Sequence, residues 1–355
     1  MRYIGNKENI IEKIDHILSA NGVTGESFFD FFAGTTNVGK YYKRKGYEIT
    51  SSDVMYMSYC LQKAYIENNE EPKFEQLLAY LPETGSDLLF VDAFDYILSY
   101  LDNLEPVHGF IYENYTPAGT CNLEQPRMYF SSENGAKIDA IRQTIEIWKE
   151  KNLLTEAEYY ILLSCLIETV SFYANVAGVY AAFHKKWDPR AVKPLKMRRI
   201  ETISNHKKNT VYCKDSCTLV PDINVDILYM DPPYNERQYL PNYHLVETIA
   251  RYDNPTIKGT TGMRSYENNK SLFCNAKKAI EQLDYIAMNA KYKYLVMSYN
   301  SEGIMPTDEI LSTLSKYGDV KLEKFEYARF KSNNNGLAKT KKTVFEELFI
   351  LKHTR

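Results

Sequence analysis

The chain has 355 residues, of which 44% are apolar and 25% charged, and its formal net charge is −3. This composition is that of a globular protein and excludes a disordered chain. The near balance of 43 basic and 46 acidic residues excludes a uniformly basic protein that coats nucleic acid, although a local basic face is still possible. The length predicts two domains, or one domain with a large insertion.

The cysteines and the apolar segments indicate the cellular compartment in which the protein is expected. The six cysteines form no CxxC pair, which argues against a structural zinc site and predicts reduced thiols in a cytoplasmic protein. The first seven residues are polar and charged, unlike a signal peptide. The most apolar stretch, 159–170, is interrupted by Ser164, Cys165 and Glu168, so no membrane span is expected.

The first third of the chain alternates strand and helix patterns. The apolar run 27–32 predicts a short buried strand that leads into Ala33 and Gly34, and a helix is expected over 36–45. Residues 47–51 predict a second strand that ends near Asp53. This order is typical of a βαβ unit with a ligand-binding turn after its first strand.

The middle of the chain predicts helices. Ser131 can cap an amphipathic helix that includes Ile138 and Trp148. Thr155 and Glu158 form a capping-box pattern before a long, largely apolar helix expected over 156–183.

The last third returns to alternation. A buried strand over 226–230, a helix over 275–291 and a strand over 294–298 precede a terminal hairpin, 320–330 and 343–351, around a polar loop. The pattern predicts an α/β sheet domain of residues 1–68 and 206–355, interrupted by a mostly helical insert of residues 69–205.

The motif Asp231-Pro232-Pro233-Tyr234 directly follows the strand expected over 226–230. Two prolines suit a turn that ends a strand, but a turn does not explain the acid and the aromatic residue beside them. Asp231 offers an anionic acceptor, Pro232 fixes a carbonyl that points away from a β-ladder, and Tyr234 offers a flat face for a planar heterocycle.

These groups suit the exocyclic amino group of a base. The lone pair of adenine N6 is delocalised into the ring, so N6 is a poor nucleophile. Two acceptors on its N–H groups favour a pyramidal nitrogen, and stacking on Tyr234 holds the ring for in-line attack on an electrophilic methyl group. The base must leave its duplex to reach such a site.

A second motif, Asp30-Phe31-Phe32-Ala33-Gly34-Thr35, lies at the end of the first strand. Gly34 allows the backbone to approach a ligand closely. Asp53 follows Gly34 by 19 residues and ends the second strand, where an acid commonly accepts hydrogen bonds from a ribose.

A competing interpretation is a P-loop nucleoside triphosphatase, because Gly34 to Lys40 reads G-x-x-x-x-G-K. Position 41 is Tyr, where a Ser or Thr should bind the metal ion, and Asp30 would repel phosphates. We therefore rank this interpretation second.

The N-terminal hexapeptide Arg2-Tyr3-Ile4-Gly5-Asn6-Lys7 offers a basic clamp for a carboxylate. Four features resemble, in this order, the motifs of alpha-group N6-adenine DNA methyltransferases, the Dam-like class that includes the FokI-type enzymes: the hexapeptide, Asp30-x-Phe32-x-Gly34, Asp215 and Asp231–Tyr234. The stretches 175–183 and 235–264 resemble the FokI-type branch in particular. The resemblance spans most of the chain.

The resemblance implies a Rossmann-like S-adenosylmethionine-dependent methyltransferase fold, with a seven-stranded mixed sheet and a helical target-recognition insert. It implies direct methyl transfer to N6 of an extruded adenine, held by Asp231, Pro232 and Tyr234, with no metal required. It also implies a bacterial or phage-encoded enzyme whose partners are double-stranded DNA and a separately encoded restriction endonuclease. The implied cofactor-binding residues are Tyr3, Lys7, Asp30, Phe32, Gly34, Thr35, Asp53 and Asp215. Among them the resemblance assigns Tyr3 and Lys7 to the methionine end of the cofactor, and Asp222 is a nearby competitor for the role of Asp215.

Basic residues are concentrated in two segments. Residues 184–208 hold nine Lys or Arg and two acids, and residues 316–342 hold eight and three, so the rest of the chain is acidic. This segregation fits a DNA-binding face, and base readout is expected in the insert and in the loop 331–342. The expected DNA-contacting residues are Lys185, Lys186, Arg190, Arg237 and Arg264.

Two further alternatives stay open. An RNA adenine or guanine amino-methyltransferase would use the same chemistry at Asp231, and a non-enzymatic DNA-binding subunit would need none of it. The long insert favours DNA over RNA, and the intact set 231–234 favours an enzyme.

Overall fold

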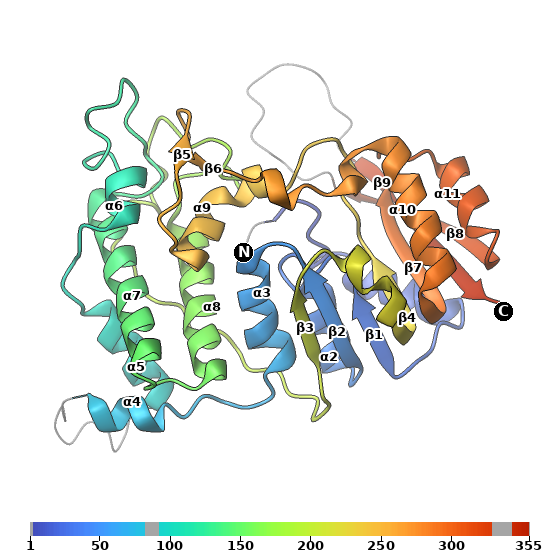
Figure 1. The fold of residues 1–355 in the computed structure, drawn as a ribbon, viewed down its shortest axis with the longest axis horizontal. Coiled ribbons are helices and arrows are strands. Elements are labelled where there is room, and N and C mark those ends of the chain that lie inside the picture. Colours follow the sequence, from blue (N-terminus) through green and yellow to red (C-terminus); the bar gives the residue numbers. More distant parts are fainter. Residues whose placement is uncertain (1–2, 82–91, 329–342, 355) are drawn as a thin grey trace. The chain divides into compact units, whose positions relative to one another are not determined.

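The structure, a computed structural model, describes residues 3–81, 92–328 and 343–354. They form two compact units (Figure 1): a sheet unit of Tyr3–Gln62, Ile203–Tyr239 and Tyr266–Arg355, and a helical unit of Lys63–Thr202 and Leu240–Ser265. The expected division, at 68/69 and 205/206, lies close to two of these boundaries. It differs at Leu240–Ser265, which the structure assigns to the helical unit and not to the sheet domain.

The sheet unit contains a mixed sheet of seven strands among the described residues, which confirms the expected fold class. The strand order is β3-β2-β1-β4-β7-β9-β8 (Figure 1). The strands from β3 to β7 are parallel, and β9 runs antiparallel to both of its neighbours. The strands are β1 (Ser27–Asp30), β2 (Glu48–Asp53), β3 (Thr210–Cys213), β4 (Asn224–Met230), β7 (Lys291–Asn300), β8 (Gly318–Ala328) and β9 (Thr343–His353).

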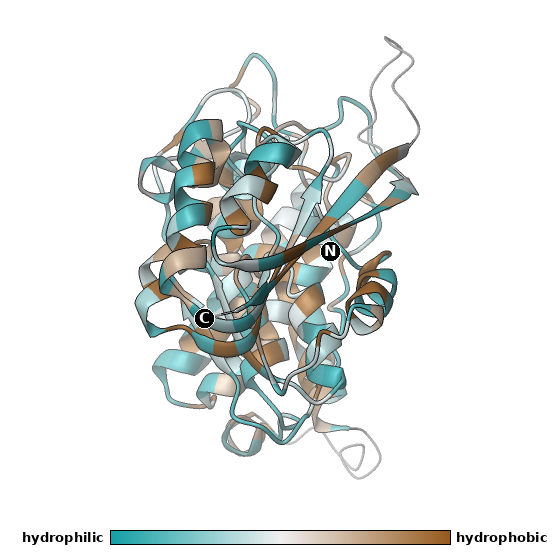
Figure 2. Cartoon of the chain, turned by 90° about the vertical axis from the view of Figure 1, so that its right-hand side faces the viewer, coloured by the Kyte–Doolittle hydropathy of each residue, from teal (hydrophilic) through white to brown (hydrophobic). Residues whose placement is uncertain are grey.

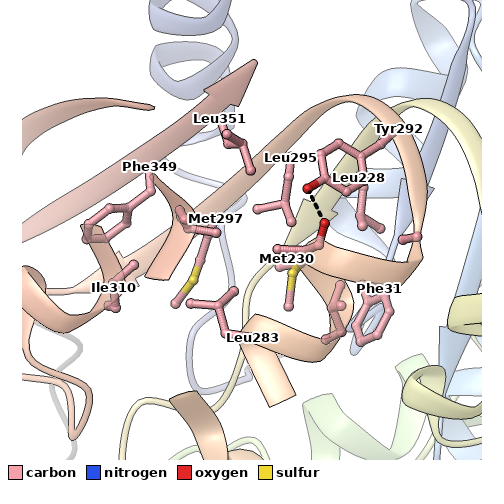
Figure 3. Close-up of a cluster of buried hydrophobic side chains, with 14 of the residues drawn as sticks. Phe31, Leu228, Met230, Leu283, Tyr292, Leu295, Met297, Ile310, Phe349 and Leu351 are labelled. Atoms are coloured by element: carbon pink, nitrogen blue, oxygen red, sulfur yellow. Dashed lines mark hydrogen bonds between the residues drawn. The ribbon is translucent and has the colours of Figure 1, made fainter. Parts of the chain in front are cut away.

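One face of this sheet is covered by α10 (Ala276–Asn289) and α11 (Thr307–Leu314). Figure 3 shows the buried cluster that joins them to the strands, in which Leu283 and Ile310 from the helices lie among side chains of β4, β7 and β9. Both helices bury one face only, and Figure 2 shows hydrophilic and hydrophobic residues side by side on the helices in that view. The amphipathic pattern that predicted α10 is therefore explained by its packing.

The opposite face of the sheet is covered by α1 (Ile11–Ala20) and α2 (Asn37–Arg44). Phe28 of β1 stacks on Tyr42 of α2 with ring centroids 4.1 Å apart. Tyr294 of β7 donates a hydrogen bond to the carbonyl of Gly22, just after α1. The expected helix over 36–45 and both early strands are confirmed. The other helical segments of this unit are α3 (Tyr56–Gln62), η3 (Ser216–Asp222), η4 (Glu267–Asn269) and η5 (Leu272–Cys274).

The helical unit confirms two predicted helix starts. Ser131 caps α7 and the capping box of Thr155 and Glu158 begins α8. None of the described helices, in either unit, combines the length and apolarity that a membrane crossing requires. The described elements of this unit are η1 (Lys63–Glu67), α4 (Glu75–Tyr80), α5 (Ala93–Asp102), α6 (Phe110–Tyr115), α7 (Ser132–Glu150), α8 (Glu156–Tyr173), α9 (Leu240–Arg251), β5 (Ile257–Lys258) and β6 (Met263–Arg264).

Helix α8 ends ten residues earlier than expected, because the next residues satisfy their polar groups elsewhere. The buried Asn175 side chain donates to the carbonyls of Met128 and His184, each at 3.0 Å, and accepts the N–H of Asp188 at 2.9 Å. These bonds join three segments and leave the backbone after Tyr173 in an extended conformation. The terminal hairpin of β8 and β9 is confirmed, and the expected loop 331–342 lies outside the described residues.

Candidate functional site

The site begins where the strand order of the sheet reverses. Strand β1 lies between β2 and β4, so the chain leaves the sheet on different sides at the carboxyl ends of β1 and β4. Ligands of open α/β sheets bind at such a point. Asp30 is the last residue of β1, and Asp231 directly follows β4, so two of the predicted acids lie at this position.

The Asp30 side chain is hydrogen-bonded to the first turn of α2. Its Oδ2 accepts the N–H of Gly39 at 3.1 Å, and its side chain is buried. Burial raises the pKa of Asp30 to about 7, the Gly39 hydrogen bond opposes the rise, and the nearby charges of Asp231 and Asp53 add to it. Asp231 and Asp53, far from Asp30 in the sequence, are therefore each close enough in the fold to repel the Asp30 carboxylate.

The turn after β1 is built around Gly34. Its φ of +49° lies in the left-handed region that favours glycine. Its N–H donates to Oδ2 of Asp53 at 2.9 Å, and Oδ1 of Asp53 accepts the N–H of Met55 at the same distance. A Cβ at position 34 would lie 3.0 Å from the ring of Tyr3. Gly34 thus lies between two other predicted cofactor residues, because it is bonded to Asp53 and lies against the Tyr3 ring.

The described part of the N-terminal segment lies over this turn. Asn6 accepts a hydrogen bond from the side chain of Asn37 at 2.6 Å, and Asn37 also donates to Thr35 at 3.3 Å. The Tyr3 ring lies 5.7 Å from that of Tyr239. The described residues of this segment therefore pack against the turn after β1 and against Tyr239, and they are not a frayed tail.

Asp231 forms an ion pair with Lys7. The Lys7 Nζ lies 3.1 Å from Oδ1 of Asp231 and 2.7 Å from Oε1 of Glu346 on β9. Burial raises the pKa of Asp231 to about 7; Lys7 counteracts this rise and Glu346 adds to it. Ser298 of β7 also donates a hydrogen bond to Oε1 of Glu346.

The three residues after Asp231 are held in place by burial and by a backbone hydrogen bond. Pro232 and Pro233 are buried, and the Tyr234 carbonyl accepts the N–H of Ile304 at 3.1 Å. The Tyr234 ring is partly buried, and a Cβ on Gly5 would lie 3.8 Å from it. Burial, with a smaller contribution from Tyr327, raises the pKa of Tyr234 to about 12, so its hydroxyl stays neutral. Tyr234 therefore lies beside the N-terminal segment that carries Lys7.

Two further predicted cofactor residues, Phe32 and Asp215, make their contacts away from the Gly34 turn and the Lys7–Asp231 ion pair. Phe32 packs edge-on against Phe31 and Phe273, with ring centroids 5.0 and 5.2 Å away. Asp215 is exposed just after β3, and its Oδ1 accepts the N–H of Cys217 at 3.0 Å. Since β3 is parallel to β2, Asp215 and Asp53 both lie at the carboxyl edge of the sheet.

The predicted DNA-contacting residues divide between the two units. Lys185 and Lys186 are exposed in the helical unit, and Arg237 is exposed in the sheet unit. In the helical unit, Arg190 pairs with Asp188 at 2.7 Å. Arg264 is mostly buried and pairs with Asp253 through two hydrogen bonds of 2.9 and 2.7 Å.

The sequence motifs missed Glu346, Ser298 and Tyr327. The signal for Glu346 was present, because two adjacent acids inside the apolar run Val344–Leu351 cannot both face solvent in a strand. Tyr327 of β8 hydrogen-bonds with Asn300 at 3.2 Å, and nearby charges of Glu346 and Asp231 contribute to its raised pKa after burial itself.

The geometry does not favour the P-loop interpretation. In a P-loop the N–H groups that open the helix bind phosphate. Here the N–H of Gly39 is bonded to the Asp30 carboxylate, which would repel a phosphate placed there.

Comparisons with known proteins agree with the motif order. Residues 3–313 match the family model described as D12 class N6 adenine-specific DNA methyltransferase. The Type II methyltransferase M.FokI of Planomicrobium okeanokoites is 40% identical over 94% of this chain and 50% of its own length. The Modification methylase StsI of Streptococcus sanguinis is 36% identical over 99% of this chain and 52% of its own length.

The chain thus spans about half the length of these two curated relatives. The Type II methyltransferase M.NlaIII of Neisseria lactamica is 35% identical, and the match covers 100% of both chains. The family match over most of the chain, together with this full-length similarity, confirms the resemblance seen in the motifs. The chain belongs to the D12 class of N6 adenine-specific DNA methyltransferases.

Proposed function

We propose that this chain methylates N6 of an extruded adenine at a specific sequence in double-stranded DNA, with S-adenosylmethionine as the methyl donor. The observation that carries this proposal is the position of Asp231 and Tyr234. They follow β4 where the strand order reverses, and Lys7 links Asp231 to the N-terminal segment, whose Tyr3 lies on the Gly34 turn. Family membership supports the same reaction.

The residues at the carboxyl edge fit the proposed cofactor. The acids Asp30, Asp53 and Asp215 follow or end three neighbouring strands, β1, β2 and β3. Carboxylates are suitable acceptors for an ammonium group, for ribose hydroxyls and for an adenine amine, respectively. Tyr3, Phe32, Gly34 and Thr35 would line the path between these acids. When bound, S-adenosylmethionine supplies an electrophilic methyl group on a sulfonium.

Lys7 receives a different role from the one that the resemblance implied. The resemblance assigns Lys7 to the methionine end of the cofactor. The Lys7 ammonium is directed to two carboxylates, Asp231 and Glu346, and its side chain is only 5% exposed. We therefore assign Lys7 to the support of Asp231.

Asp231 and Pro232 would hold the amino group of the target adenine. The Asp231 carboxylate accepts one N–H and the Pro232 carbonyl accepts the other, while the Tyr234 ring stacks on the base. Asp231 must be ionised to accept, so Lys7 assists by opposing the effect of burial. The proton lost from N6 after transfer leaves through this carboxylate or through water.

The helical unit is proposed to read the target sequence. It carries the exposed Lys185 and Lys186 and the hairpin of β5 and β6. The buried Arg127 holds this hairpin through the carbonyls of Gly259 and Thr260, at 3.0 and 2.9 Å. Fixed backbone with exposed loop residues is suited to contact with a groove.

The relatives suggest a biological setting. The names Type II methyltransferase and Modification methylase, from bacteria, support a modification enzyme in a bacterial or phage-infected cytoplasm. A separately encoded restriction endonuclease of the same specificity would be its partner.

The test is to express the chain in a host that lacks DNA methylation and to sequence the host DNA with modification-sensitive reads. We expect N6-methyladenine at one defined motif, absent in Asp231→Ala. Purified protein should also transfer labelled methyl groups to duplex DNA in preference to RNA. Labelled RNA instead would favour the RNA alternative, and methylated cytosine would contradict the base assignment.

A further inference from the structure

Glu346 is a buried acid that lies outside the recognised motifs. It lies on β9, opposite Asn300 of β7 and Phe325 of β8, and its side chain has no exposed surface. An ionised carboxylate in the interior is costly unless charged or polar groups compensate it. Its partners therefore indicate why it is there.

The compensation comes mainly from Lys7. Lys7 Nζ lies 2.7 Å from Oε1 of Glu346, and Ser298 donates to the same oxygen. The second oxygen, Oε2, is buried and has no hydrogen-bond partner among the described residues. A carboxylate that served only to stabilise the fold would be expected to use both oxygens.

The same ammonium also faces Asp231, at 3.1 Å. One positive charge is thus shared between two carboxylates, and the trio carries one excess negative charge when both acids are ionised. Without Glu346, the whole charge of Lys7 would act on Asp231, and Asp231 would become a weaker hydrogen-bond acceptor.

We propose that Glu346 is a positioning residue that draws the Lys7 ammonium partly away from Asp231 and thereby keeps Asp231 a strong acceptor for the target amino group. This inference rests on the proposed function, because it assigns Asp231 to the target base. Glu346 acts through Lys7 and is not placed in contact with the base.

Four other titratable groups interact electrostatically with Asp231, and the experiment leaves all four unchanged. They are Asp30 of β1, Tyr229 of β4, Tyr234 in the turn after β4 and Tyr327 of β8.

The experiment compares Glu346→Gln with the parent protein. Glutamine has the same shape and still accepts a hydrogen bond from Lys7, but it carries no charge. The pH dependence of single-turnover methyl transfer should shift its acid limb about one pH unit lower, because Asp231 loses a nearby like charge. The plateau rate should fall several-fold, because a less basic carboxylate accepts more weakly.

A second readout does not need activity. Carboxyl carbons of aspartate are labelled with carbon-13, and the Asp231 resonance is identified by its loss in Asp231→Asn. Its titration in Glu346→Gln should shift to lower pH by the same amount. If the glutamine variant does not fold, Glu346→Met, which also removes the charge, replaces it.

Glu347→Gln is the matched control. Glu347 is the next residue of β9 and is equally buried, but it pairs with Lys324 at 2.6 Å and accepts from Thr307 at 2.9 Å. We expect no shift of either profile in this variant. Profiles of the Glu346 variant that match the parent, or an equal shift in the control, would overturn the inference. Absence of methyl transfer by the parent would overturn the proposed function instead, and the carbon titration would still decide the role of Glu346.

Discussion

The carboxylate of Asp53, at the end of β2, accepts the backbone N–H of Gly34, in the turn after β1, at 2.9 Å. This bond joins the ends of two adjacent parallel strands and fixes the turn on which Tyr3 lies. A single acid thus shapes the backbone of the proposed cofactor site and would also meet the ribose there. Changes at the turn should therefore weaken cofactor binding in addition to lowering stability.

Gly34→Ala tests this expectation. Alanine at φ +49° is strained by about 1–2 kcal/mol, and its Cβ would press on the Tyr3 ring at 3.0 Å. We expect the dissociation constant for S-adenosylmethionine, measured by calorimetry, to rise at least about tenfold, a loss of about 1.4 kcal/mol. The free energy of unfolding should fall by about 1–2 kcal/mol in urea.

Gly46→Ala is the control for the backbone strain. Gly46 also has a positive φ, +85°, but a Cβ there would meet nothing within 4 Å. It should lose similar stability and keep the parent's affinity for the cofactor. Equal affinities in the two variants would show that the approach of Tyr3 to the turn has no role in binding.

Asp30→Asn should change how stability depends on pH. The folded pKa of Asp30 is about 7, above the ordinary value of 3.8, so the folded state binds more protons between these values. Stability therefore falls as the pH rises from about 4 to 7. The asparagine variant lacks this loss, so its advantage over the parent in urea unfolding should grow by about 2–3 kcal/mol between pH 5 and pH 8.

Asp226→Asn should have the opposite effect on stability: it should make the protein less stable than the parent. Asp226 accepts the N–H groups of Glu26 and Ser27, which lower its pKa below the ordinary value of 3.8, so its stabilising effect is complete above about pH 5. The asparagine variant should be less stable than the parent by the same amount at pH 5 and at pH 8. If the stability difference between Asp30→Asn and the parent were also the same at pH 5 and at pH 8, the raised pKa of the buried Asp30 carboxylate would be contradicted.

Asp30→Asn should also weaken cofactor binding, since the site loses its negatively charged acceptor for a cation.

Double replacement of Lys185 and Lys186 by alanine tests the proposed DNA contact. Both side chains are exposed after α8. If each neutralises one phosphate, the slope of log affinity against log salt should become less steep by about two. Gel-shift titrations at several salt concentrations measure this slope.

Lys149 and Lys151 are the matched pair in the same unit. They already interact with Glu146 and Tyr80, at 3.3 and 2.7 Å. Their double replacement should leave the slope unchanged. Arg190→Ala should have a smaller effect than either exposed lysine, because its guanidinium is already paired with Asp188.

The sequence was most informative where structure and chemistry are local. The strand before Asp231, the glycine turn at position 34 and the caps at Ser131 and Thr155 each depend on a few neighbouring residues. Periodicity and capping therefore predicted them, and the motif order predicted which strand ends would meet.

What the sequence missed depends on partners that are distant along the chain. The length of α8 is limited by Asn175, whose bonds reach Met128 and Asp188. Glu346 is 115 residues from Asp231, and only the strand order places β9 two strands from β4. The membership of Leu240–Ser265 in the helical unit also results from packing, which no local pattern encodes.

Arg127→Lys tests whether the hairpin of β5 and β6 reads the target sequence. The guanidinium donates to three carbonyls, those of Asn114, Gly259 and Thr260, at 2.9 to 3.0 Å. Lysine cannot reproduce this fork, so the variant should lose about 1–3 kcal/mol of stability. We expect weaker discrimination between the target and single-base mismatches, with unchanged cofactor affinity.

Arg142→Lys separates the hairpin from general destabilisation. Arg142 is equally buried in the helical unit and donates to the carbonyls of Ile249 and Ala250, each at 3.2 Å, at the end of α9. It should cost comparable stability and leave discrimination intact. Methylation rates on target and mismatched duplexes give the ratio for both variants. The same loss of discrimination in both variants would mean that recognition depends on the packing of the whole unit. A loss confined to Arg127→Lys would locate recognition at the hairpin, because Arg127 bonds to residues 259 and 260 whereas Arg142 bonds to residues 249 and 250.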